Sequence, residues 1–305
     1  MKIDKNWLVQ ESQTEKIVKD PTTNFQYQIS PKYLIIHYTA GDKASGAITW
    51  FKQTPAQGNT DRICAHIVID LDGTITQLAP FNTRCNHAGY SSWDGRTGMN
   101  EYAIGIEIVN PGFCEKLTDG SFRRRVGENK DGTPSYKLYP ASEKDRIVKL
   151  KHKHKFWDSK ENQYWFKYTD AQIAAVSKLS KLLIDTYQLS FVVGHDDISP
   201  ARKPDPGPAF PWDEFKTNVF GKTDNIGKIF LVNSVSDGVA EFRTKPDKTS
   251  SSIRTLKNGY EVGLIETFGQ WSKVYLVNDV KDIKDWKHSI KIEGWIHSSL
   301  LKPKN

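Results

Sequence analysis

The sequence predicts a mixed α/β domain, with a central sheet and flanking helices, followed by a small all-β barrel. In the N-terminal part, short apolar runs suited to buried strands alternate with a helical repeat. From residue 229 onward the pattern changes to short strand-like runs separated by turn residues. The 305 residues are enough for one large and one small domain, which we expect at 1–222 and 228–305.

The strands expected in the first domain are short and apolar or alternating. They are 33–38, 66–71, 74–78, 103–109 and 191–194. Asp72-Gly73, between the second and third of them, is a two-residue hairpin signal. A short helix is expected at 45–54, because Pro55 follows it. A longer helix should open at Thr169-Asp170, where apolar residues begin to recur at helical spacing.

Two regions depart from this pattern. Residues 112–165 are charged and rich in Gly, Lys and Arg, and we interpret them as an insertion into the first domain.

Near the C-terminus the strand-like runs are 230–235, 239–243, 260–266, 271–277 and 294–296. Such short runs with turn residues between them are typical of a small barrel.

Composition limits the partners and the compartment. The formal net charge of +7 favours encounters with anionic polymers, but no nucleic-acid fold signature accompanies it, so we expect no nucleic-acid partner. No stretch is long and apolar enough for a transmembrane helix, and the start of the chain lacks the apolar core of a secretory signal. Three cysteines, an odd number without CxxC spacing, predict reduced buried thiols rather than a disulfide framework.

Two histidines and an aspartate suggest a metal site. His37 ends the first expected strand, and His195 follows the last one. Asp205 lies ten residues beyond His195, in a loop stiffened by Pro204 and Pro206. Two imidazoles and a carboxylate can occupy three corners of a tetrahedral zinc site and leave the fourth for water, which is the ligand count of a catalytic site.

Five segments, in order along the chain, resemble the zinc-dependent N-acetylmuramoyl-L-alanine amidases of type 2, a family that shares its fold with peptidoglycan-recognition proteins. They are 34–40, 65–70, 87–89, 104–107 and 194–208. The resemblance implies that His37, His195 and Asp205 bind Zn²⁺ and that Glu107 and Lys203 form the catalytic pair. Asp205 stands where some members of the family have Cys.

The sequence around Glu107 and Lys203 is itself consistent with catalytic roles for both residues. Glu107 shares its strand face with small and apolar residues, and a carboxylate there needs a partner. Lys203 lies two residues from Asp205, where a rigid loop can hold its ammonium near a developing oxyanion. His66 and His87 are candidate substrate contacts, although each can also be a packed histidine or a further ligand.

The resemblance implies a peptidoglycan amidase that uses zinc-activated water to hydrolyse the amide between N-acetylmuramic acid and L-alanine. A non-catalytic peptidoglycan-binding protein and a zinc hydrolase of another amide remain as alternatives. Four short pieces of the C-terminal region, 242–246, 256–260, 271–274 and 294–296, resemble bacterial SH3-type domains, which often bind cell-wall peptides.

The substrate is either intact cell wall or a small muropeptide. A wall-binding module favours the polymer, because tethering raises the local enzyme concentration there. The absence of a recognisable signal favours the cytoplasm, unless the protein is exported by a non-classical route, as a phage lysin or a secreted effector would be.

Overall fold

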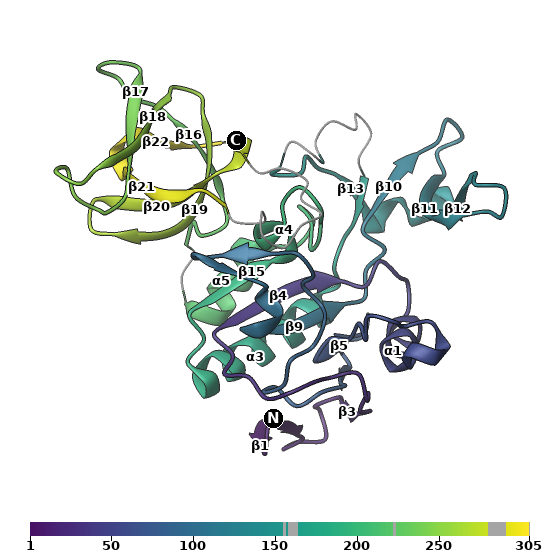
Figure 1. Cartoon of the computed structure of the whole chain (residues 1–305). Helices are drawn as coiled ribbons and strands as arrows, with labels where there is room; N and C mark the ends of the chain where they lie inside the picture. Colours follow the sequence, from purple (N-terminus) through teal and green to yellow (C-terminus); the bar gives the residue numbers. More distant parts are fainter. Residues whose placement is uncertain (155–156, 158–163, 222–223, 280–290, 305) are drawn as a thin grey trace. The chain divides into compact units, whose positions relative to one another are not determined.

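The computed structural model describes residues 1–154, 157, 164–221, 224–279 and 291–304 (Figure 1). These residues form two compact units, each built from several stretches of the chain. The first unit comprises Met1–Ala88, Asn100–His195 and Pro204–Thr223, and the second comprises Gly89–Met99, Asp196–Lys203 and Asp224–Asn305. The predicted boundary between 222 and 228 remains a prediction, and residues 222 and 223 lie outside the described part.

A six-stranded mixed sheet forms the centre of the first unit, with the order β15-β4-β9-β5-β6-β3. Its strands are β3 (Ile17–Lys19), β4 (Tyr33–Tyr38), β5 (Ile67–Ile69), β6 (Ile75–Gln77), β9 (Ala103–Ile108) and β15 (Phe191–Gly194). Of the neighbouring pairs only β5 and β6 are antiparallel, and Gly73 turns between them at a φ of 81°. The predicted mixed sheet and its hairpin are therefore confirmed.

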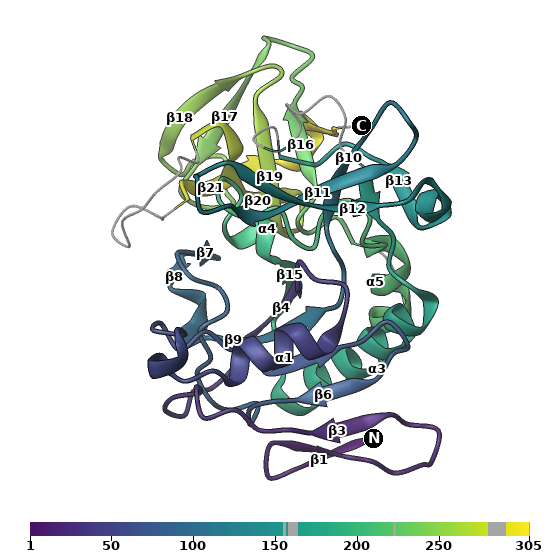
Figure 2. The same cartoon turned by 90° about the vertical axis from the view of Figure 1, so that its right-hand side faces the viewer.

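Helices cover both faces of this sheet. Helices α3 (Asp170–Tyr187) and α5 (Trp212–Phe220) bury their apolar residues against one face, and α1 (Ala44–Lys52) packs against Val68 on the other. Thr169 caps α3, since its hydroxyl accepts the Gln172 backbone N–H at 3.1 Å. In Figure 2 the N-terminus lies beside the hairpin of β1 (Lys2–Asp4) and β2 (Trp7–Val9).

The expected insertion contains a second, five-stranded sheet in the first unit. Its strands are β10 (Phe113–Lys116), β11 (Phe122–Glu128), β12 (Pro134–Tyr139), β13 (Ile147–Lys149) and β14 (Tyr164–Phe166). All neighbouring strands are antiparallel, in the order β12-β11-β10-β14-β13, around a small core that includes Phe122 and Phe166. Residues 155, 156 and 158–163 of the insertion lie outside the described part.

The second unit is built on a seven-stranded antiparallel sheet, which we call the C-terminal sheet, in the order β18-β17-β21-β20-β19-β16-β22. Its strands are β16 (Ile229–Val232), β17 (Val239–Arg243), β18 (Ser252–Lys257), β19 (Glu261–Phe268), β20 (Trp271–Leu276), β21 (Glu293–His297) and β22 (Leu301–Pro303). Alternate residues of these strands form one apolar core. The sequence pattern predicts five of these strands but misses β18 and β22. Strand β18 is rich in Ser, Arg, Thr and Lys and therefore lacks a clear apolar alternation, and β22 is only three residues long.

Two segments that lie far from the C-terminal sheet in sequence belong to the same unit. One carries the hairpin of β7 (Ser92–Trp93) and β8 (Arg96–Thr97). The other, Asp196–Lys203, contains most of the short helix α4 (His195–Ile198).

The three cysteines are buried and free, as predicted. The neighbouring Cys85 thiol lowers the pKa of Cys64 despite its burial, whereas burial and the same contact raise the pKa of Cys85 well above its usual value. Among the described residues, no helix is long and apolar enough to span a membrane.

Candidate metal and catalytic site

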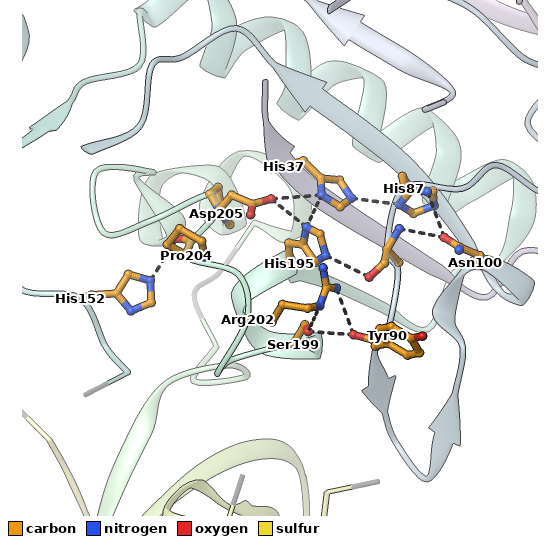
Figure 3. A network of polar contacts seen from close by, with 12 residues as sticks. His37, His87, Tyr90, Asn100, His152, His195, Ser199, Arg202, Pro204 and Asp205 are labelled. Carbon is orange, nitrogen blue, oxygen red and sulfur yellow. Dashed lines mark hydrogen bonds and ion pairs between the residues drawn. The ribbon is translucent and has the colours of Figure 1, made fainter. Parts of the chain in front are cut away.

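Three buried side chains of the first unit converge on one point (Figure 3). His37 and His195 bring their Nδ1 atoms to 2.9 Å from each other, and Asp205 Oδ2 lies 3.1 and 3.0 Å from these two nitrogens. The exposed fractions of the three residues are 1%, 3% and 5%. The structure thus brings together all three residues predicted as metal ligands.

The sheet register explains why the two histidines meet. Strand β15 runs parallel to β4 with Gly194 level with Ile36, and a histidine follows each of these partners, His37 within β4 and His195 at the start of α4. The parallel pairing thus brings the two histidines next to each other at the same edge of the sheet. Asp205 reaches them from the loop that follows α4.

The outer ring nitrogens of the histidines fix their tautomers. His195 Nε2 lies 3.0 Å from the Ala88 carbonyl oxygen, which can only accept, so this nitrogen carries the proton. His87 Nε2 likewise donates to the Ala103 carbonyl at 3.3 Å, which leaves His87 Nδ1 to accept from His37 Nε2 at 2.9 Å. In both predicted ligands the inward Nδ1 therefore presents a lone pair.

Two lone pairs and a carboxylate that face one another repel unless a cation or a proton lies between them. Burial would raise the pKa of Asp205, but a proton on the inward Nδ1 of His195 or His37 would donate to this carboxylate and hold its pKa well below the usual range. The donor set of two neutral imidazoles and one carboxylate is one that a divalent metal such as zinc accepts. The arrangement fits a metal centre that keeps an open coordination position.

Gly105 makes room for the ring that orients His37. A Cβ atom at position 105 would lie 2.6 Å from Cγ and from Nδ1 of His87, which is closer than such atoms approach. The His87 and Ala88 backbone N–H groups both donate to Asn100 Oδ1, at 3.1 and 2.8 Å, and this anchors the loop. Outer hydrogen bonds of this kind set ligand orientation in metal sites.

Glu107 lies level with His37 in the parallel pairing of β9 with β4. It shares its face of β9 with Gly105, as the sequence indicated, and it is half-buried while its neighbours Ile106 and Ile108 are fully buried. Its carboxylate therefore belongs to the same face of the sheet as the ligand His37, where a general base would have to be.

Lys203 belongs to the second unit and is partly exposed. Its backbone N–H donates to the Ser199 carbonyl at 2.9 Å, which continues the turn after α4. Its predicted catalytic role remains a prediction.

The two candidate substrate histidines make internal hydrogen bonds. His66 is fully buried, and its ring contacts the Thr83 carbonyl at 2.8 Å and the Gly105 N–H at 3.0 Å. Burial lowers the pKa of His66 to about 4, so the ring is neutral near pH 7. These contacts favour the packed alternative for His66. The substrate role of His87 remains a prediction, beside its hydrogen bond to His37.

Sequence reasoning did not identify Asn100, the Ala88 carbonyl or His152 as supports of the site. His152 comes from the insertion and donates through Nε2 to the Pro204 carbonyl at 3.0 Å, next to Asp205 (Figure 3). The only available signal for Asn100 was its place shortly after the loop of His87. Nothing in one sequence signals which backbone carbonyl an imidazole will contact.

Comparison with known proteins places the chain in a family. A family model described as N-acetylmuramoyl-L-alanine amidase matches residues 27–208, a stretch that includes His37, Glu107, His195 and Asp205. The chain therefore belongs to the N-acetylmuramoyl-L-alanine amidase family.

Two curated proteins of Escherichia coli illustrate the similarity. The chain is 30% identical to N-acetylmuramoyl-L-alanine amidase AmiD over 236 residues, 76% of this chain and 67% of that protein. It is 31% identical to 1,6-anhydro-N-acetylmuramyl-L-alanine amidase AmpD over 164 residues, 53% of this chain and 61% of that protein. The matched part thus spans less than two thirds of AmpD.

A solved structure of AmiD from E. coli, in complex with the substrate anhydro-N-acetylmuramic acid-L-Ala-D-gamma-Glu-L-Lys, is also similar. It aligns with a TM-score of 0.42 and 26% identity, over 65% of this chain and 60% of that chain.

The fit of His87 over Gly105 leads to a prediction. Gly105→Ala should displace the His87 ring, remove its hydrogen bond to His37 and weaken the affinity for a divalent metal about 10- to 100-fold, as loss of outer-shell partners does elsewhere. Competition with a chromophoric chelator, with Zn²⁺ as the probe metal, measures the effect.

Gly127→Ala is the matched control, since Gly127 also lies in a strand and nothing lies within 4 Å of the added Cβ. Equal metal affinity in the two variants would show that His87 does not orient His37.

Proposed function

We propose that this protein is a zinc-dependent amidase that hydrolyses the bond between the lactyl group of N-acetylmuramic acid and the L-alanine of the stem peptide. One observation carries the proposal: in a member of this amidase family, two imidazole lone pairs and a carboxylate converge in a buried site. The complete ligand set argues for an enzyme rather than a binding protein.

His37, His195 and Asp205 would hold the zinc ion. When bound there, zinc supplies a Lewis acid that activates water and polarises the scissile carbonyl. The ligands contribute a total charge of −1, which leaves the centre with a net positive charge. A carboxylate in place of a thiolate also makes the donor set harder and reduces its affinity for zinc.

Glu107 is the proposed proton carrier. Its carboxylate lies on the ligand-bearing face, level with His37, so it can take a proton from the attacking water and pass it to the leaving amine of L-alanine. An amine is a poor leaving group until it is protonated, and general acid–base help of this kind contributes about 10²- to 10⁴-fold in rate.

Lys203 is the proposed oxyanion partner. It precedes Pro204 and the ligand Asp205, so a short and stiff stretch of chain links its ammonium to the site. The tetrahedral oxyanion of amide hydrolysis carries a charge that the carbonyl lacks, and an ammonium aimed at it stabilises the transition state preferentially.

For the C-terminal sheet we propose an SH3-like role in binding the cell wall. A groove of about 350 Å³ on this sheet is lined by Trp271, His297, Glu241 and Arg243, among others, and the first two rings meet edge to face at 5.4 Å. Aromatic and charged side chains together suit a peptide that carries carboxylates.

Tethering on the polymer makes intact peptidoglycan the favoured substrate over a free anhydro-muropeptide. AmpD relatives are named for the anhydro substrate, so both remain to be compared. A preference for the small anhydro-muropeptide would favour action in the cytoplasm. A preference for intact peptidoglycan would favour export to the cell wall by a non-classical route.

Product analysis tests the function directly. Zinc-loaded protein should release stem peptides with a free L-alanine amine from purified sacculi and from an anhydro-N-acetylmuramyl peptide, as read by mass spectrometry. If neither substrate is cut while sacculi still bind the protein, the chain is a non-catalytic binding protein. Cleavage at a different amide would replace the proposed specificity.

The proton role of Glu107 makes a separate prediction. Glu107→Gln should keep the fold and the zinc content but lower turnover by at least about 10², because the amide cannot accept the proton. Steady-state kinetics on the small substrate, together with elemental analysis, measure both properties.

Glu214→Gln is the control for Glu107→Gln, because Glu214 is an exposed residue of α5. If Glu107→Gln and the control turn over alike with equal zinc, the base lies elsewhere.

A further inference from the structure

The C-terminal sheet makes specific buried contacts with the two segments that border the ligand site in sequence. Lys291, just before β21, is only 6% exposed. Its ammonium donates to the Ser92 carbonyl at 2.8 Å and to the Asp197 carbonyl. A buried ammonium needs such acceptors, because desolvating an unpaired charge is strongly unfavourable.

Two aromatic rings also lie against this ammonium. Lys291 Nζ lies 4.8 Å from the ring centroid of Trp93 and 4.5 Å from that of Tyr275, and both rings are fully buried. Cation–π contacts of this length are strongest where water is excluded. One residue next to the C-terminal sheet thus contacts both Ser92 of β7 and Asp197 of α4.

Two further contacts tie the same segments to the same unit. Lys273 of β20 reaches the Asp94 carboxylate in the β7–β8 turn at 2.6 Å. Gly227, just before β16, packs so close to Asp197 that a Cβ there would lie 3.0 Å from both carboxylate oxygens.

Each of these two segments directly follows a residue that takes part in one hydrogen bond at the ligand site. Asp196 directly follows the ligand His195, and Gly89 directly follows Ala88, whose carbonyl accepts the His195 Nε2 proton. Ser199 Oγ and Arg202 Nη2 also donate to the Tyr90 carbonyl, at 2.8 and 3.0 Å, so the two segments hold each other (Figure 3).

We propose that Lys291 is a positioning residue for the ligand His195, and that the C-terminal sheet therefore supports the chemistry as well as any tethering. By donating to the Ser92 and Asp197 carbonyls, Lys291 fixes the two segments that directly follow Ala88 and His195 in the chain. This inference rests on the proposed function of His195 as a zinc ligand. It implies that catalysis on a small soluble substrate, to which tethering is irrelevant, also depends on Lys291.

Lys291→Met in the full chain tests the proposal, because it keeps the length of the side chain and removes the charge and the donors. We expect zinc loss to a chelator to be about 10-fold faster and kcat on the anhydro-N-acetylmuramyl peptide about 10-fold lower, the lower end of the effects of outer-shell changes. KM should stay within about 2-fold, because substrate contacts are unchanged. Lys291→Arg, which keeps charge and donors, should restore most of both properties.

The control is Lys257→Met, at an exposed lysine of β18, which should match the wild type. Hydrogen exchange of residues 196–203 should rise in Lys291→Met and not in this control. If wild-type protein binds no zinc and cleaves nothing, the proposed function fails, yet the exchange comparison still decides whether Lys291 immobilises the segment. Wild-type zinc loss, kcat and exchange in folded Lys291→Met would overturn the proposal.

A second pair of variants serves if Lys291→Met does not fold. Gly227→Ala pushes on Asp197, whereas Gly259→Ala has the same positive φ with nothing within 4 Å of its Cβ. Zinc loss should be about 3-fold faster in the first than in the second, a small outer-shell effect. Equal rates would overturn the proposal.

Discussion

The site depends on one electrostatic constraint. Two imidazole nitrogens that carry lone pairs and a carboxylate oxygen lie within 3.1 Å of one another, almost without access to water. Such a cluster is stable only if a cation lies at its centre or if an inward ring nitrogen takes up an extra proton. The outer hydrogen bonds of His195 and His37 already place one proton on the outer nitrogen of each ring, so the inward nitrogens are left to bind a cation. Much of the nearby structure serves this arrangement: Ala88 and His87 hold the outer ring nitrogens, and Gly105 leaves space for His87.

The parts of the fold that sequence could predict were those with strong local signals. The apolar runs around His37 and before His195 became β4 and β15, and the alternation around Glu107 became β9, with Glu107 on the face of Gly105 as expected. The insertion was predicted only as charged sequence, because its exposed, two-sided polar strands lack a clear period, and it proved to hold a five-stranded sheet.

Long-range contacts to backbone atoms could not be predicted. The ring of His195 is oriented by the Ala88 carbonyl, 107 residues away, and Lys291 reaches the Asp197 carbonyl across 94 residues. A carbonyl group is present in every residue, so no residue type marks these partners. The sequence suggested a C-terminal module that tethers the protein to the cell wall. This module also forms one unit with 89–99 and 196–203, the segments that directly follow Ala88 and the ligand His195 in the chain.

X-ray absorption at the zinc edge, on active full-length protein, tests the central claim most directly. The account predicts one zinc per chain with two imidazole nitrogens at about 2.0–2.1 Å, oxygen ligands at similar distances and no sulfur. The two-imidazole signal should be lost in His37→Ala. A sulfur ligand at about 2.3 Å, or active protein without a bound transition metal, would contradict the assignment of His37, His195 and Asp205 as the metal ligands.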